Sequence, residues 1–200
     1  MLDGAAKIDK LLDAAVEQKM PAIAMTDHGT LFGAYEFWKK ANDRGIKPIV
    51  GIEAYLAPAS RFDKKPIRFA DGSDGDVSGG GAYTHLTLLS ETTEGMHNLF
   101  TLSSKSYIEG FYQKQRMDHE LLAQNSKGLI ATSGCVSGEV QTYLRFGMYE
   151  EAKRAASTMR DIFGKENYFI EIMDHGIAIE RQGIKDLLRL AKELDLPLVL

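Results

Sequence analysis

Cysteine is almost absent from this sequence: Cys135 is the single example among 200 residues. A disulfide within the chain is therefore excluded, and a lone free thiol fits a reducing compartment, so we expect a cytoplasmic protein. The sequence also lacks a run of about eighteen apolar residues and a segment with the character of a secretory signal peptide. We therefore expect neither insertion into a membrane nor export.

An excess of positive charge is missing as well. The sequence carries 24 Lys and Arg against 28 Asp and Glu, which gives a formal net charge of −4. Binding to a nucleic-acid backbone depends on a local excess of Lys and Arg. We do not expect this chain to grip DNA or RNA by itself, although a contribution inside a larger assembly stays open.

Both ends lack the elements that would complete a domain. The first four residues lead directly into a helical pattern without a preceding strand, and the chain stops within an apolar run at 196–200 that indicates a strand. Two hundred residues suffice for one domain with a substantial core, or for part of a larger one. We expect one partial domain over residues 1–200, a piece of a longer protein.

Apolar periodicity predicts strands that alternate with helices. Six strands are expected, near residues 22, 48, 84, 129, 168 and 196. Such alternation implies a mostly parallel sheet or barrel. Six strands are too few for an eight-stranded barrel, which leaves an incomplete smaller barrel or an open sheet. In the helix expected at 31–43, the predicted inner stripe is Ala34, Tyr35, Trp38 and Ala41.

A long loop is expected at 57–82, where no periodic pattern occurs. Its first part, 61–68, is basic with interleaved apolar residues, and 71–81 is rich in Gly, Ser and Asp, so we expect a mobile segment. The basic part could contact a phosphate backbone or could be a solvated loop.

Residues with metal-ligating side chains recur along the predicted strands. His28 follows the strand at 22–26 in the run Thr-Asp-His-Gly, Glu53 interrupts an apolar strand, and Cys135 stands at a strand tip. His85 fits less neatly, because it leads its strand instead of ending it. Imidazole, carboxylate and thiolate together suit zinc or a similar divalent ion. Chemistry in βα folds gathers at the carboxyl ends of strands, where several strands each supply one residue.

Each of these residues also has a structural interpretation. Asp3 precedes the first helix and could be its N-cap. Glu53 could pair with an Arg or Lys. Cys135 could be a small buried hydrophobic residue, and the residues around His28 could form a polar turn. The residues alone leave these alternatives open.

Five longer motifs carry a family resemblance. They are Met-Thr-Asp-His-Gly at 25–29, Pro-Ile-Val-Gly-Ile-Glu-Ala-Tyr at 48–55, His-Leu-Thr-Leu-Leu at 85–89, Ser-Tyr-Ile-Glu-Gly-Phe-Tyr at 106–112 and Ile-Ala-Thr-Ser-Gly-Cys-Val-Ser-Gly-Glu-Val at 130–140. Together they resemble the PHP (polymerase and histidinol phosphatase) family, most closely the amino-terminal PHP domain of bacterial replicative DNA polymerase III alpha subunits. The resemblance implies an α/β fold, a distorted seven-stranded βα barrel of TIM-like character. The first strand and the end of the last strand would lie outside this chain.

The resemblance also implies a metal centre. Its ligands would be Asp3, His28, Glu53, His85 and Cys135. Asp27 would not bind the metal itself but would orient an imidazole that does. Zinc is the expected metal. The His-x-His of the family's first motif and the Asp-x-His of its last are absent from this sequence. We therefore expect weak, incomplete metal binding and poor nuclease activity from the chain alone.

The implied chemistry is metal-dependent phosphodiester hydrolysis, a 3′–5′ exonuclease that accompanies template-directed DNA synthesis. The implied partners are DNA, through the polymerase, and replisome subunits such as the sliding clamp and a separate proofreading exonuclease. Two alternatives remain: a non-catalytic module that stabilises the polymerase and docks the proofreading subunit, and a stand-alone PHP phosphoesterase.

Overall fold

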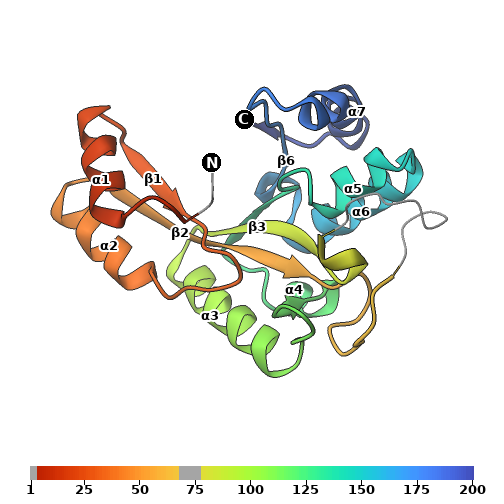
Figure 1. The fold of residues 1–200 in the computed structure, drawn as a ribbon, viewed down its shortest axis with the longest axis horizontal. Coiled ribbons are helices and arrows are strands. Elements are labelled where there is room, and N and C mark those ends of the chain that lie inside the picture. The colour runs from red at the N-terminus through yellow and green to blue at the C-terminus, as the bar shows by residue number, and fades with distance from the viewer. Residues whose placement is uncertain (1–3, 68–77) are drawn as a thin grey trace.

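Seven short strands form one curled sheet in the computed structural model, which describes residues 4–67 and 78–200 (Figure 1). The strands are β1 (Ala22–Met25), β2 (Lys47–Leu56), β3 (Thr84–Ser90), β4 (Arg116–Met117), β5 (Leu129–Thr132), β6 (Tyr168–Glu171) and β7 (Leu198–Val199). The helices are α1 (Ile8–Glu17), α2 (Ala34–Asp43), α3 (Thr93–Ile108), α4 (His119–Gln124), α5 (Glu139–Arg145), α6 (Tyr149–Phe163) and α7 (Ala178–Leu194). All six predicted strands are confirmed, and the α/β barrel-like fold with them.

The order of strands across the sheet is β1-β2-β3-β5-β6-β7, with β4 beside β2. The sheet is mostly parallel, as predicted. The exception is β3, which runs antiparallel to both β2 and β5. Parallel neighbours require a long crossover, usually a helix, and the described parts of the connection from β2 to β3, residues 57–67 and 78–83, contain no α-helix. The chain instead turns back beside β2 and pairs Tyr55 with His85.

The reversal of β3 explains the odd position of His85. The amino end of an antiparallel strand lies at the same edge of a sheet as the carboxyl ends of its neighbours. His85 near the start of β3 therefore shares an edge with the end of β2 and with the residues after β1. Strand β4, only two residues long, was not predicted, and it pairs with Tyr55 and Leu56 at this same edge.

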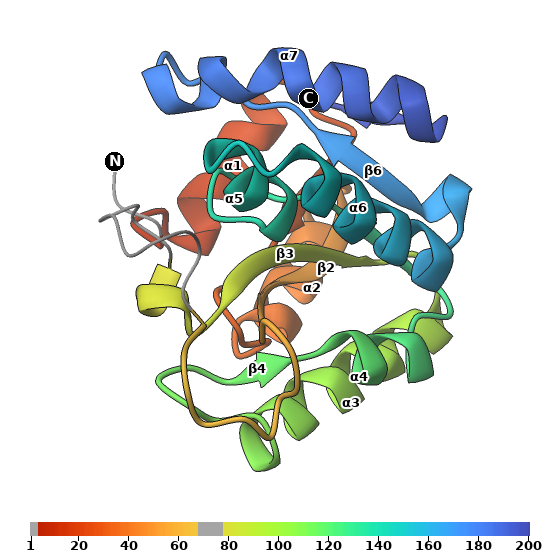
Figure 2. The same ribbon diagram turned by 90° about the vertical axis from the view of Figure 1, so that its right-hand side faces the viewer.

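Helices cover the sheet on both faces. In Figure 2, α3 and α4 lie on one side of β2 and β3, and α5 and α6 lie on the other, with α7 beyond them. The main core gathers leucines from these layers, among them Leu88, Leu99, Leu121 and Leu129, all fully buried. Among the described residues no helix is both long and apolar enough to span a lipid bilayer.

The sequence prediction for α2 is half wrong. Ala34, Phe37 and Ala41 form its buried face, whereas Tyr35 is 72% and Trp38 51% exposed. A 3.6-residue period can be satisfied by two neighbouring stripes of one helix, and the larger aromatic side chains suggested the wrong one. Tyr35 and Trp38 instead stack on each other at the surface, with ring centroids 6.3 Å apart.

Helix α3 begins against the backbone of a neighbouring turn. Thr92 caps the helix by accepting a hydrogen bond from the Gly95 amide. A Cβ on Gly95 would stand 1.7 Å from the carbonyl oxygen of Gly128, so only glycine allows this approach. The Thr92 and Glu91 amides bond to the same carbonyl, which fixes α3 to the start of β5.

The described part of the long loop is fastened to α3 and α4. Arg61 is buried and pairs with Asp118, with Oδ1 at 2.9 Å, and with Glu109, with Oε2 at 2.6 Å. The neighbouring Lys64 donates hydrogen bonds to the carbonyls of Glu109 and Phe111. Arg61 is therefore engaged within the fold, and phosphate contact by the basic stretch 61–68 stays a prediction. Residues 68–77 lie outside the described residues, and the predicted mobility of 57–82 stays a prediction.

Candidate metal centre

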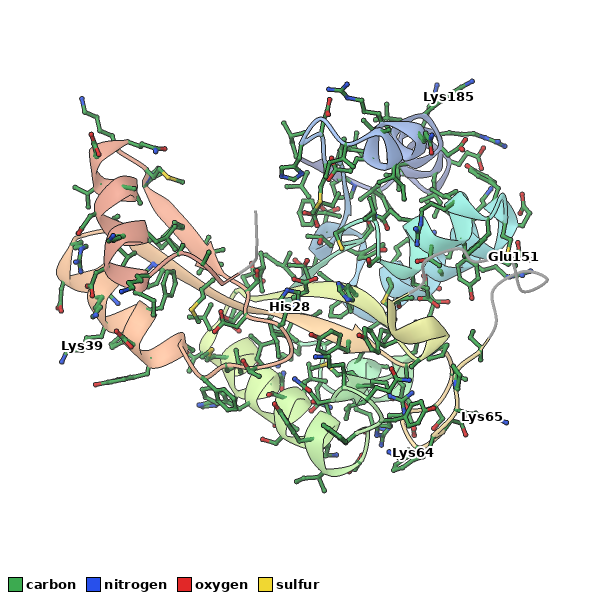
Figure 3. The ribbon with its side chains drawn as sticks, viewed as in Figure 1. His28, Lys39, Lys64, Lys65, Glu151 and Lys185 are labelled. Atoms are coloured by element: carbon green, nitrogen blue, oxygen red, sulfur yellow. The ribbon has the colours of Figure 1, made fainter. Side chains whose placement is uncertain are left out.

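Four predicted ligands meet at one edge of the sheet. His28 follows β1 and forms a parallel bridge with Glu53 of β2, while His85 pairs with Tyr55 across β2 and β3. Figure 3 places His28 where the chain after β1 approaches β2 and β3. Cys135 lies in the turn after β5. A hydrogen bond from the His85 amide to the Ser137 carbonyl holds this turn next to β3.

One carboxylate joins the two imidazoles. Glu53 places Oε1 2.6 Å from Nδ1 of His85 and Oε2 3.5 Å from Nδ1 of His28. The Cys135 sulfur lies 3.8 Å from Nδ1 of His85. Ligand atoms of Glu53, His85 and Cys135 all lie within 4.8 Å of one another. The structure thus brings four of the five predicted ligands together; the fifth, Asp3, lies outside the described residues.

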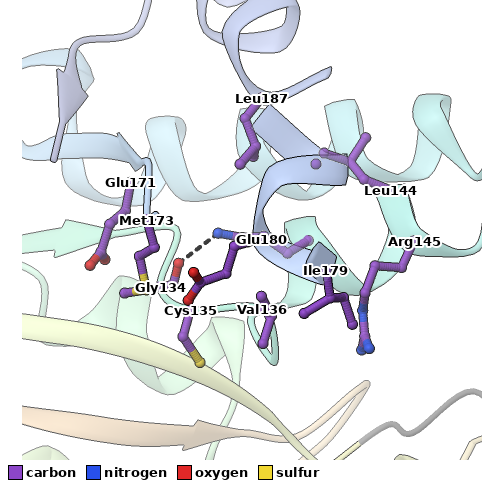
Figure 4. A pocket seen from close by; sticks show the side chains of 12 residues that line it. Gly134, Cys135, Val136, Leu144, Arg145, Glu171, Met173, Ile179, Glu180 and Leu187 are labelled. Carbon is purple, nitrogen blue, oxygen red and sulfur yellow. Dashed lines mark hydrogen bonds between the residues drawn. The ribbon is translucent and has the colours of Figure 1, made fainter. Parts of the chain in front are cut away.

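The structural interpretations of these residues fare differently. The partners of Glu53 at this edge are imidazoles, not the Arg or Lys that the sequence left open. Helix α1 has Lys7 in the N-cap position, and the N-cap interpretation of Asp3 concerns a residue outside the described ones. Cys135 is partly exposed and accepts a hydrogen bond from the Ser137 amide at 3.4 Å, so it is not a buried apolar residue. Figure 4 shows its sulfur directed away from Glu180 and toward β3.

Asp27 contacts Glu53 through its backbone, while its side chain faces helix α2. Its backbone carbonyl accepts a hydrogen bond from the Glu53 amide, and its carboxylate faces the start of α2, 3.2 Å from where a Cβ of Gly33 would stand. Carboxylates are favourable near a helix N-terminus. The prediction that Asp27 orients an imidazole stays a prediction.

The electrostatics of the site are dominated by its anionic groups. Burial by itself would lower the pKa of His85, but the hydrogen bonds to Cys135 and Glu53 outweigh burial and raise it to about 9. Without a cation, His85 therefore holds a proton at neutral pH. A metal ion entering this site would displace that proton and take over its role of neutralising Glu53.

Aromatic rings fix the orientation of both imidazoles. The ring of Tyr55 lies 6.2 Å from that of His28 and 5.4 Å from that of His85, centroid to centroid. Tyr83 packs edge-on against Tyr55 at 4.8 Å and stacks on His85 at 5.9 Å. Burial raises the pKa of the Tyr55 hydroxyl, with smaller contributions from Tyr83, Glu53 and Tyr107. The aromatic residues thus form a rigid wall for the site, a role that sequence periodicity did not reveal.

The chemistry of the donor set fits zinc. Tetrahedral zinc holds neighbouring nitrogen, oxygen and sulfur ligands roughly 3.3–3.8 Å apart, and the 3.8 Å between Cys135 and His85 lies at the end of that range. The 2.6 Å between Glu53 and His85 is a hydrogen-bond distance. These two side chains would separate by less than about 1 Å on taking up a metal ion.

A small enclosed space lies behind Cys135, between α5, β6 and α7 (Figure 4). It encloses about 20 Å³ and is lined by Cys135, Glu171 and Glu180 among others. The carboxylate of Glu171 accepts a hydrogen bond from Thr132, and that of Glu180 pairs with His175. Both carboxylates are therefore engaged in local contacts, and this space is part of the packing behind the site.

Comparisons with known proteins agree with this geometry. A family profile described as "PHP domain" matches residues 1–175. The chain is 56% identical over 98% of its length to DNA polymerase III subunit alpha of Saccharopolyspora erythraea and 52% identical over 98% to that of Mycobacterium tuberculosis. It is 42% identical over its whole length to that of Thermus aquaticus. The chain spans only 16–17% of these relatives' length.

A solved structure shows the same fold. It belongs to a protein of Bifidobacterium adolescentis described as a candidate metal-dependent phosphoesterase, and it superposes with a TM-score of 0.53 at 12% identity, covering 98% of this chain and 81% of that one. At this identity the likeness concerns the fold alone. With the family profile covering most of the sequence, the chain belongs to the PHP domain family.

Proposed function

We propose that this chain is the metal-dependent phosphodiester hydrolase domain of a replicative DNA polymerase alpha subunit and that it removes nucleotides from DNA 3′ ends. The observation that supports this is the convergence of Glu53, His85 and Cys135 within 4.8 Å, with His28 on the same carboxylate. DNA would reach the domain through the polymerase, as the net charge of −4 gives this chain no general affinity for a phosphate backbone.

The ligands of the metal would be His28, Glu53, His85 and Cys135, with Asp3 as a further ligand. A bound divalent ion supplies a nucleophilic water near neutral pH and stabilises charge on the attacked phosphate. The two oxygens of Glu53 hold His28 and His85 at a fixed separation. Tyr55 and Tyr83 prevent either imidazole from rotating out of the site. Zinc is the metal proposed, because a thiolate stands in the donor set.

The decisive experiment compares two histidine variants of the polypeptide as its own gene encodes it. His28→Ala should lower hydrolysis of single-stranded DNA from the 3′ end by roughly 100-fold and lower bound zinc, with DNA synthesis retained. His97→Ala is the matched control, since His97 is exposed on α3 and its ring packs beside Phe100. Unchanged hydrolysis and zinc content in His28→Ala would contradict the proposal.

A second candidate function is a non-catalytic module that stabilises the polymerase and docks a proofreading subunit. The observation in its favour is an apolar groove of about 660 Å³ between α2 and α3, whose lining includes Phe32, Tyr35, Trp38, Met96 and Phe100. Under this function His28→Ala would leave exonuclease activity where it was, or lower synthesis and exonuclease together through instability.

The remaining proposals follow from membership of a replicative polymerase. The partners would be DNA, the sliding clamp and a separate proofreading exonuclease, and the site of action would be the cytoplasm. A stand-alone PHP phosphoesterase is the third candidate. Hydrolysis of a small phosphate monoester in preference to DNA would favour it.

A further inference from the structure

A tight turn at 112–114 presents a lysine beside the metal centre. The Tyr112 amide donates a hydrogen bond to the Lys114 carbonyl at 2.9 Å, and the residue between them, Gln113, has φ of 60°. A side chain larger than glycine in this left-handed region costs backbone strain, which persists only where the surroundings enforce it. Lys114 itself is exposed.

The residues on the carboxyl side of this turn enforce its position. The side chain of Gln115, 7% exposed, donates a hydrogen bond at 3.0 Å to the carbonyl of Gly29, the residue after His28. A Cβ on Gly29, whose φ is 64°, would stand 2.1 Å from the Gln115 amide nitrogen. The neighbouring Arg116 is fully buried and bonds four backbone carbonyls. The turn is thus fixed to the segment that carries His28.

The ammonium group of Lys114 lies over the ring of Tyr55, and that ring packs beside the imidazoles of His28 and His85. Its Nζ is 5.7 Å from the ring centroid of Tyr55, which itself touches His28 and His85. Among the described residues four other lysines, Lys40, Lys127, Lys153 and Lys165, form ion pairs with carboxylates. Within 4–67 and 78–200, no carboxylate forms an ion pair with Lys114, and the Tyr55 ring is the group that it contacts. An aromatic face attracts a cation but leaves its donors available.

We propose that Lys114 binds a non-bridging oxygen of the substrate's phosphate, next to the phosphorus atom that is attacked at the metal centre. An ammonium group is a compact charge that suits phosphate. The carboxylate of Glu53 brings negative charge to the site, so a cation beside the metal would help to hold a phosphate there. The assignment makes Lys114 a substrate-binding residue, and it rests on the hydrolytic function proposed above.

The test measures phosphate binding separately from hydrolysis. Inorganic phosphate is titrated by calorimetry into the zinc-supplemented polypeptide as its own gene encodes it, in wild type, Lys114→Met and Lys114→Arg. Lys39→Met is the matched control, because Lys39 is an exposed lysine on α2, far from the site in Figure 3. Lys114→Met should weaken phosphate binding by about 10-fold with zinc content unchanged, Lys114→Arg should recover most of it, and Lys39→Met should have no effect.

Kinetics on a short single-stranded DNA give a second readout. Lys114→Met should raise KM, and log KM should depend less steeply on log salt concentration, by roughly one unit of slope. Phosphate binding equal to wild type in Lys114→Met, an equal loss in Lys39→Met, or a parallel loss of zinc would each overturn the assignment. Wild type without hydrolysis would refute the proposed function, while the phosphate titration would still decide the role of Lys114.

Discussion

Arg116 offers the sharpest test of how this fold is held together. Its guanidinium is fully buried, and the hydrogen-bond partners it has there are backbone carbonyls, those of Gly110, Ala82, Arg61 and Asp63, at 2.6 to 3.3 Å. Burial lowers the pKa of Arg116, because loss of water disfavours the charged form of the guanidinium. The four bonds must outweigh that penalty.

The effect of Arg116→Met follows from these contacts. Gly110, Ala82 and Arg61 are buried, so their carbonyls would lose a donor without gaining water, whereas the exposed Asp63 can be rehydrated. Each buried carbonyl left without a donor costs about 1–3 kcal/mol. Removal of the buried guanidinium charge offsets part of this cost, so the expected loss of unfolding free energy is about 3–5 kcal/mol. For a domain of this size that corresponds to a fall in Tm of about 10 °C.

Urea and thermal unfolding of wild type, Arg116→Met and Arg116→Lys would measure this loss. The lysine variant keeps the positive charge but has a single ammonium nitrogen in place of the planar guanidinium group. It should therefore recover only part of the stability. Arg160→Met is the surface control, because among the described residues Arg160 forms its ion pair with the adjacent Asp161, and it should change stability by less than about 0.5 kcal/mol. A loss below about 1 kcal/mol in Arg116→Met would refute the reasoning, as the carbonyls would then have other partners.

Two of the three further predictions concern glycines, and the third concerns the partly buried pair of His119 and Glu139. Gly95→Ala should destabilise the protein by more than about 3 kcal/mol in urea unfolding, since its Cβ would meet the Gly128 carbonyl at 1.7 Å. Gly183→Ala in α7 meets no atom within 4 Å and should instead stabilise by about 0.5–1 kcal/mol. Burial would lower the pKa of His119, but its hydrogen bond to Glu139 at 3.2 Å raises it. That stabilisation is complete below the unfolded pKa of about 6.5 and fades as pH rises through the raised value, so Glu139→Gln should cost about 1 kcal/mol more at pH 6 than at pH 9. An equal cost at both pH values would contradict the pairing.

The sequence was sufficient for six of the seven strands but not for their directions. Apolar runs at 22–25, 47–56 and 129–132 identify strands because strands that lie within a covered sheet are written as nearly continuous apolar sequence. The direction of β3 depends on where a long connection returns, and no local pattern records that. The misfit of His85 at the start of its strand was the one signal available, and the antiparallel pairing accounts for it.

Side-chain partners were the least predictable part of the site. Glu53 was recognisable as a carboxylate in an apolar run, yet its choice of imidazole partners depends on three strands meeting at one edge. The positions of Lys114 and Gln115 depend on a left-handed residue and on a glycine far away in sequence. Periodicity is silent on contacts of that kind, because they are set by tertiary packing.

The antiparallel placement of β3 also bears on the order of events in folding. Cys135 and His85 are 50 residues apart in sequence, and they meet only once β3 has paired with both β2 and β5. Contacts between residues so far apart in sequence form late, because closing the loop between them costs entropy, and only the pairings of the completed sheet offset that cost. The candidate metal ligands would therefore come together in the finished fold alone, and the rate of divalent-metal uptake during refolding would report when the sheet closes.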